Sequence, residues 1–226
     1  MAWDFGAEIS ALSGFDADYN VDISTGETYR AHANQWLTQG AKEIINILPP
    51  DLKMECSTMT ALTSTTPMDL DASGPIFHVT RENADSGFHV PCRKIPSEYG
   101  GMASSSSGHM MYEASVTDPV YWTTSDTSGD PKLFVKPDPT ANQPARVHHV
   151  AYPTVAYSDT TIVNFPDEAE HLVTLYAAIK ATEFMMLSEE DMEVYGPQLQ
   201  ALQQDYGQGL QMLLGPAAMS AKGEQK

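Results

Sequence analysis

The sequence predicts an α+β protein, in which a small helical bundle of one N-terminal helix and two C-terminal helices carries an inserted antiparallel β region. Two observations predict the helices and one predicts the strands. Apolar residues recur at three- and four-residue steps over residues 24–52 and again over residues 164–215, which is the period of an amphipathic helix. Between these segments, residues 53–163 carry short β-type runs separated by turn residues.

The first predicted helix lies within residues 24–52. Ser24 and Glu27 have the spacing of a capping box, which satisfies two backbone N–H groups at a helix start. Pro49 and Pro50 end the helix, because the residue before a proline is disfavoured in the helical region. We predict that the face around Trp36 packs against the two C-terminal helices. Residues 1–23 carry scattered aromatic residues and are predicted as an irregular N-terminal arm without a core pattern.

The inserted β domain is predicted over residues 53–163. Two pairs of runs rich in β-branched and aromatic residues flank turn segments, which is the pattern of a hairpin, and two further runs follow. The predicted strands are residues 76–80 with 88–90, residues 120–123 with 133–135, and the later runs 147–151 and 161–163.

Two consecutive helices are predicted over residues 164–215, which carry nine acidic residues and one lysine. Pro166 suits the first position of a helix, and the acidic residues that follow it favour the positive end of the helix dipole. Apolar residues on more than one face of this first helix predict more than one packing neighbour. Ser188 starts the second helix, and Gly196-Pro197 predicts either a kink or a break within it.

The sequence shows no convincing catalytic or metal-binding set, so we expect a protein that is not an enzyme and needs no cofactor. His78, His89 and Cys92 match no zinc spacing. His148 and His149 are adjacent on a predicted strand, so their side chains point to opposite faces and cannot both join Asp159 in a hydrolytic site. Cys56 and Cys92 are isolated and predict buried thiols or strand residues, not a disulfide framework.

The formal net charge of −18 argues against a protein that grips nucleic acid, which requires clustered lysine and arginine. It is compatible with a conduit that repels passing DNA, and equally with a charge that only keeps the protein soluble. No run is long and apolar enough to cross a membrane, and residues 1–18 lack the positive start of a signal peptide.

Residues 216–226 are predicted as a flexible C-terminal tail. They contain small residues, the single large apolar residue Met219, and the bases Lys222 and Lys226. Two interpretations remain open. The tail can order on an adjacent subunit or another partner, with Met219 buried and the lysines near carboxylates, or it can have no role.

Several segments of the chain resemble the head-to-tail connector proteins of tailed bacteriophages, which are also called adaptor or neck proteins. Residues 26–49 resemble their opening helix, and residues 165–181 with 188–191 resemble their paired C-terminal helices. The resemblance extends to the β part of such virion proteins, over residues 118–122, 132–137 and 146–152.

The resemblance implies a structural virion protein without catalytic residues. Such a protein forms a homo-oligomeric ring, expected to be a dodecamer, below the portal protein at the head–tail junction. It extends the DNA channel without binding DNA specifically, and it docks the next neck or tail component. Before assembly it resides in the host cytoplasm. The alternative is another virion structural protein, such as a tail-completion or capsid-associated subunit.

Overall fold

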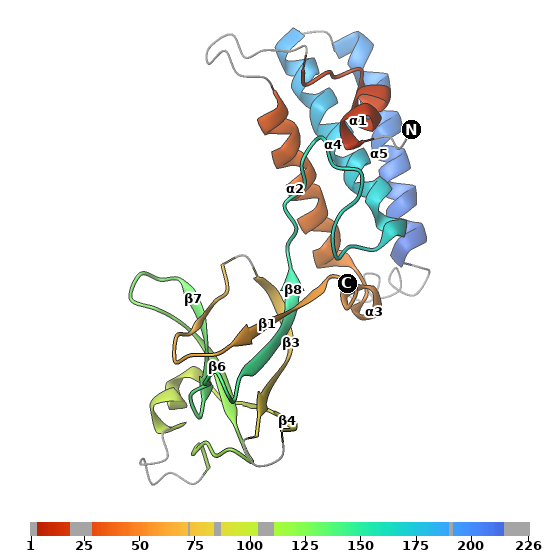
Figure 1. Cartoon of the computed structure of the whole chain (residues 1–226). Helices are drawn as coiled ribbons and strands as arrows, with labels where there is room; N and C mark the ends of the chain where they lie inside the picture. The colour runs from red at the N-terminus through yellow and green to blue at the C-terminus, as the bar shows by residue number, and fades with distance from the viewer. Residues whose placement is uncertain are drawn as a thin grey trace, which may run out of the picture. The chain divides into compact units, whose positions relative to one another are not determined.

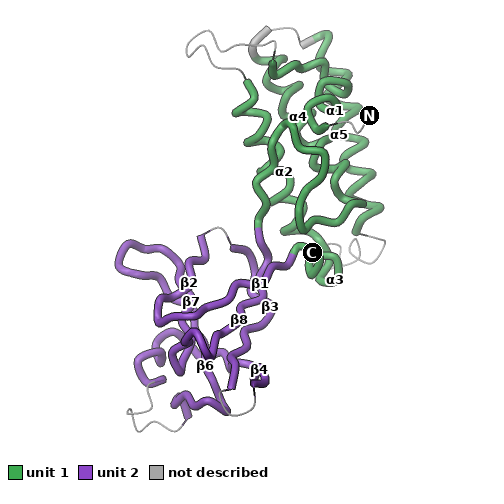
Figure 2. Tube along the Cα trace, viewed as in Figure 1, with its two compact units in different colours: residues 1–56, 152–226 green, residues 57–151 purple. Residues whose placement is uncertain are grey.

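The computed structural model of the chain describes residues 4–18, 29–71, 73–83, 87–103, 111–189 and 192–214. It contains both helices and sheets, so the protein belongs to the α+β class. The chain divides into two compact units, which Figure 2 colours separately. Residues 1–56 and 152–226 form the helical unit, and residues 57–151 form the β unit.

The helical unit is organised around one central helix. Helix α4 contacts α1, α2 and α5, as Figure 1 shows. This explains why α4 is apolar on more than one face, as the sequence predicts. Its helices are α1 (Phe5–Ser13), α2 (Arg30–Ile47), α3 (Pro50–Lys53), α4 (Asp167–Glu189) and α5 (Met192–Leu214).

The N-terminal segment departs from the predicted irregular arm, because residues 5–13 form helix α1. Asp4 caps this helix by accepting a hydrogen bond from the Ala7 N–H at 2.7 Å. The backbone N–H groups of Phe5 and Gly6 donate to the carbonyls of Asp159 and Tyr157. Four apolar side chains on or just after this helix are buried, and they supply the core pattern that the prediction missed: Phe5, Ile9, Phe15 and Ala17.

Helix α2 begins at Arg30 and ends before Leu48, at the predicted proline stop. The predicted capping box at Ser24 and Glu27 lies outside the described residues. Trp36 contacts α4 through Phe184, with ring centroids 5.9 Å apart, as predicted for one of the two C-terminal helices. Its side chain is half-buried, and Phe15 packs against it at 5.6 Å.

Helices α4 and α5 confirm the two consecutive helices predicted near the C-terminus. The predicted start of the second helix at Ser188 is wrong, because Ser188 still belongs to α4 and α5 begins at Met192. The predicted break at Pro197 is wrong, since α5 runs through this residue. Pro197 lies in the second turn, where the carbonyl that loses its partner belongs to exposed Glu193 and remains open to water.

The strand predicted at residues 161–163 is also wrong. This segment forms a turn before α4, and its Ile162 N–H donates to the Glu170 carboxylate at 2.6 Å.

The β unit consists of two four-stranded sheets with the orders β1-β8-β3-β4 and β2-β7-β6-β5. The two predicted hairpins are confirmed as the antiparallel pairs β3–β4 and β6–β7. Pairing is not purely antiparallel, because β5 and β6 run parallel. The strands are β1 (Ser57–Leu62), β2 (Met68–Asp69), β3 (Ser73–Glu82), β4 (His89–Pro91), β5 (Arg93–Lys94), β6 (Val120–Ser125), β7 (Pro131–Lys136) and β8 (Ala145–Ala151), and the 3-10 helix η1 spans Ser97–Ala103.

The core of the β unit lies between its two sheets. Val79 and Val147 from one sheet pack with Leu133 and Val135 from the other. Arg81 is also buried there, with 2% of its surface exposed. Its guanidinium donates to the backbone carbonyls of Pro137, Asp138 and Glu82 and to the side chain of Gln143, at 2.9–3.2 Å. Burial lowers the pKa of Arg81, and these bonds tie β3 to the segment that follows β7.

A glycine sets the distance between α2 and α4. A Cβ atom at Gly40 would lie 2.8 Å from Cδ1 of Tyr176, which is closer than real Cβ contacts allow, and 3.1 Å from its Cγ, which is a tight contact. Helix α5 offers a matched comparison, because a Cβ at Gly207 would meet nothing within 4 Å.

We predict opposite effects for alanine at these two helical glycines. Gly40→Ala should lower the free energy of unfolding by about 1–3 kcal/mol, because the Tyr176 ring must shift. Gly207→Ala should raise it by up to about 1 kcal/mol, because alanine has the higher helix propensity. Urea unfolding followed by far-UV circular dichroism measures both. Equal effects of the two substitutions would contradict a close approach of α2 and α4 at Gly40.

Candidate functional site

The histidines of the β unit occupy separate environments. His78 on β3 stacks on His148 on β8, with ring centroids 4.2 Å apart. His149 points to the other face, where it is buried and lies 3.0 Å from Oγ1 of Thr60. The opposite orientations of His148 and His149 agree with the sequence prediction. Partial burial lowers the pKa of His148, and the neighbouring His78, Arg146 and His149 lower it further.

The candidate metal residues do not form a ligand set. Nε2 of His89 lies 3.8 Å from the Glu82 carboxylate, and its buried Nδ1 has no hydrogen-bond partner among the described residues. Cys92 packs against the core between the sheets, and burial raises its pKa to about 12. The described part of the chain holds no group of three or more His, Cys, Asp or Glu residues placed to bind a metal ion.

Asp159 and Cys56, the other residues considered for chemistry, have local structural roles in the helical unit. The Asp159 carboxylate accepts a hydrogen bond from the Ala156 N–H at 2.8 Å and so closes its own turn. Cys56 is buried, as predicted, and burial raises its pKa to about 11. A thiol with so high a pKa is almost fully protonated at neutral pH and is therefore a poor nucleophile.

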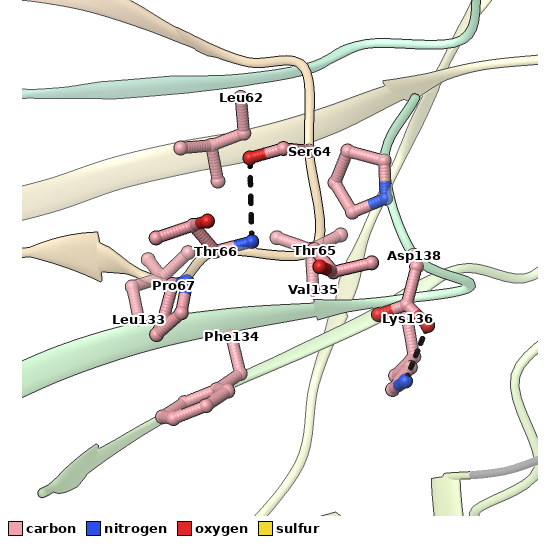
Figure 3. A pocket seen from close by; sticks show the side chains of 11 residues that line it. Leu62, Ser64, Thr65, Thr66, Pro67, Leu133, Phe134, Val135, Lys136 and Asp138 are labelled. Carbon is pink, nitrogen blue, oxygen red and sulfur yellow. Dashed lines mark hydrogen bonds and ion pairs between the residues drawn. The ribbon is translucent and has the colours of Figure 1, made fainter. Parts of the chain in front are cut away.

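A crevice of about 330 Å³ lies in the β unit between β7 and the loop that joins β1 to β2 (Figure 3). Ser64, Thr65 and Thr66 supply hydroxyl groups to its lining. Lys136 and Asp138 also line it, and they are paired with each other at 2.6 Å. This lining offers hydrogen bonds to a polar partner, but a lysine already held by a carboxylate is not poised as a catalytic base.

The edge strands of the β unit differ in how they are protected against pairing with another chain. Edge β2 is two residues long, β4 ends in Pro91, and β5 consists of Arg93 and Lys94. Short length, proline and positive charge each discourage strand addition. Edge β1 has six residues without charge or proline and keeps an unbroken register with β8. It is therefore the edge best suited to backbone pairing with another chain.

The helical unit has a mostly apolar groove of about 350 Å³ between α3, the start of α4 and the end of α5. Its lining residues are Leu52, Glu168, His171, Gly209, Met212 and Leu213. Met212 is 82% exposed. Sequence reasoning missed this groove. The apolar stripe that the sequence predicts for α5 consists of Met192, Tyr195, Leu199, Leu202, Tyr206, Leu210 and Leu213. Met212 lies outside this stripe, and an apolar residue off the packed face was the available signal.

The predicted partner-binding residues Met219, Lys222 and Lys226 lie outside the described residues. Helix α5 ends at Leu214, directly after the groove residues Met212 and Leu213. The structure therefore locates the point from which the tail departs, and the docking of the tail stays a prediction.

The family described as "SU10 adaptor protein" matches residues 12–224. The chain belongs to this family. The match covers nearly the whole sequence and identifies a phage adaptor protein, which is the broader part of the resemblance seen in the sequence. No curated protein matches this adaptor. Within the described residues, no helix of the adaptor is long and apolar enough to span a membrane.

The charge of the adaptor is concentrated in its helical unit. Residues 1–56 and 152–226 contain 20 of the 30 acidic residues and 6 of the 12 basic residues. Helix α5 carries Glu193 and Asp205 and no base. The β unit is closer to neutrality, so the two units differ in net charge.

We predict that lowering the pH destabilises the β unit through His148. A histidine whose folded pKa lies below its unfolded value binds fewer protons when folded, so stability is complete above pH ~6.5 and is lost as the pH falls below it. His148→Phe keeps a stacked ring without a charge and should reduce the decrease in melting temperature between about pH 7.5 and 5.5.

An identical pH profile for His148→Phe and the unmodified adaptor would disprove the role of this stack.

Proposed function

We propose that this adaptor is a non-catalytic subunit of the phage neck. It forms a homo-oligomeric ring below the portal protein, extends the DNA channel and docks the next neck or tail component. The match of the adaptor family to residues 12–224 carries this proposal. The adaptor acts without a cofactor, at the head–tail junction of the virion, after a period in the host cytoplasm.

The surfaces of the two units support a role in assembly. The helical unit exposes an apolar groove that a partner can cover, and the β unit offers the unprotected edge β1 together with a hydroxyl-rich crevice. An interface core needs apolar surface that water leaves, and a strand edge supplies backbone hydrogen bonds for a partner strand. Separate surfaces of these kinds allow one subunit to hold like copies and unlike components at the same time.

The mass of the assembled protein tests this proposal directly. Native mass spectrometry and electron microscopy of the purified full chain, alone and after addition of portal-bearing heads, are expected to show a closed ring, with a dodecamer as the specific expectation. A chain that remains monomeric at every concentration and does not bind these heads would refute the neck role.

Electrostatics gives a second prediction. If the acidic helical unit lines the channel, it repels DNA phosphates over a screening length of ~8 Å at physiological salt. Fluorescence anisotropy with labelled duplex DNA should therefore show no measurable binding at 150 mM salt, a concentration taken as physiological. Binding that is tight and weakens steeply as salt is raised would contradict a repelling channel wall.

A further inference from the structure

The groove of the helical unit combines an apolar lining with an acidic rim. Met212 exposes most of its side chain beside Leu52 and Leu213. Glu168 lies at the rim in the first turn of α4, next to exposed Asp167. Apolar surface is stabilised when a partner covers it, and the acids favour a partner that carries positive charge. The lining therefore selects an occupant with an apolar anchor followed by a base.

Gly209 leaves space within this groove because it has no side chain. A Cβ atom at this position would lie 2.4 Å from Cδ2 of Leu172 and 3.2 Å from Nε2 of His171. A larger side chain would enter the groove or push α5 away from α4. The absence of a side chain at Gly209 therefore preserves both the contact between the helices and the space above it.

Residues 216–226 match this requirement. Their one large apolar side chain is Met219, and Lys222 follows three residues later. The segment is otherwise made of small or polar residues, with the further base Lys226 and one acid. Its composition cannot build a core of its own, but it can order on a surface that is already folded.

We propose that the groove is the receptor for residues 216–226 of a neighbouring copy. Met219 fills the space beside Met212 and Leu213, and Lys222 lies near Glu168. The proposal rests on the proposed ring assembly, and it assigns to that assembly the contact between adjacent subunits.

We assign the segment to a neighbouring copy because such a contact suits the proposed ring. Tail and groove are different surfaces of one chain, so a tail from one copy in the groove of the next is a heterologous contact. Repeated heterologous contacts close into a ring when the rotation between copies allows it. A two-fold dimer would instead require the same patch on both copies.

Cysteine cross-linking of the full chain tests this contact. In the double variant Met212→Cys/Met219→Cys, mild oxidation with oxidised glutathione should link adjacent chains into a ladder on non-reducing gels. The native Cys56 and Cys92 have pKa values raised by burial to about 11 and about 12, so they react slowly. Each single variant should give little ladder.

A matched control places the first cysteine elsewhere on the helical unit. Leu187 of α4 is an apolar residue of similar exposure, 76% against 82% for Met212. It lies 16 residues from the groove residue His171, roughly 24 Å along the helix. The variant Leu187→Cys/Met219→Cys should form at least about tenfold less cross-linked product. Equal ladders from both pairs, or a disulfide within a single chain, would overturn the proposal.

Charge reversal provides a test that does not depend on new thiols. Glu168→Lys and Lys222→Glu should each reduce the assembled fraction in sedimentation velocity, and the double variant should recover most of it. Sedimentation of the unmodified chain separates the two proposals. If it forms rings while neither the cysteine pair nor the charge pair affects them, the groove is not the receptor and the neck role stands. If it never assembles, alone or with portal-bearing heads, the neck role itself fails.

Discussion

The helical unit depends on the packing of α4 against three other helices. A helix that contacts neighbours on several sides needs small residues where they approach, and Ala169, Ala177, Ala178 and Ala181 on α4 are all fully buried. Glycines on the neighbouring helices serve the same purpose, with Gly40 facing Tyr176 and Gly209 facing Leu172. The small size of these residues therefore helps to set the positions of α2 and α5 on α4, together with the apolar contacts. Enlarging any of these residues forces a helix outward, since packed interiors leave little free volume.

The β unit depends on a different constraint, because a polar group is fixed in its interior. Arg81 is buried and satisfies its guanidinium with carbonyl and amide oxygens from the segment after β7. Burying a charge is costly unless hydrogen bonds compensate, so this arrangement requires one specific path for residues 137–143. The apolar core between the two sheets tolerates variation in shape, whereas the Arg81 network specifies one connection.

Sequence reasoning found the long helices and missed one short helix and several strands. Helices α2, α4 and α5 have 18 to 23 residues, which repeats the apolar period often enough to be recognised. Helix α1 has nine residues and is stabilised by contacts with residues 157 and 159, about 150 positions away, which no local pattern reveals. Strands β1 and β2 were missed because Ser and Thr dominate the region around them, and a polar edge strand lacks the alternation of a half-buried one.

The candidate surfaces were harder to predict than the fold for a related reason. Histidines and cysteines attract attention in a sequence, yet most of those considered for chemistry have structural environments. His78 and His148 stack on each other, His149 lies against Thr60, and Cys56 and Cys92 are buried or packed against a core. The groove is made mostly by a glycine, two leucines and a methionine, with Glu168 and His171 of α4 beside them. Glycine, leucine and methionine do not signal a site by themselves.

The length of an element and the spacing of its apolar residues indicate how a single chain packs on itself. The surfaces proposed for other chains lie where that packing stops, at the end of α5 and at the edge strand β1. In both places the chain leaves apolar side chains or backbone hydrogen-bonding groups partly uncovered. Burying such groups within the subunit would stabilise the free chain and leave less surface for partners to cover. Their exposure is therefore consistent with a subunit that completes its packing with partners.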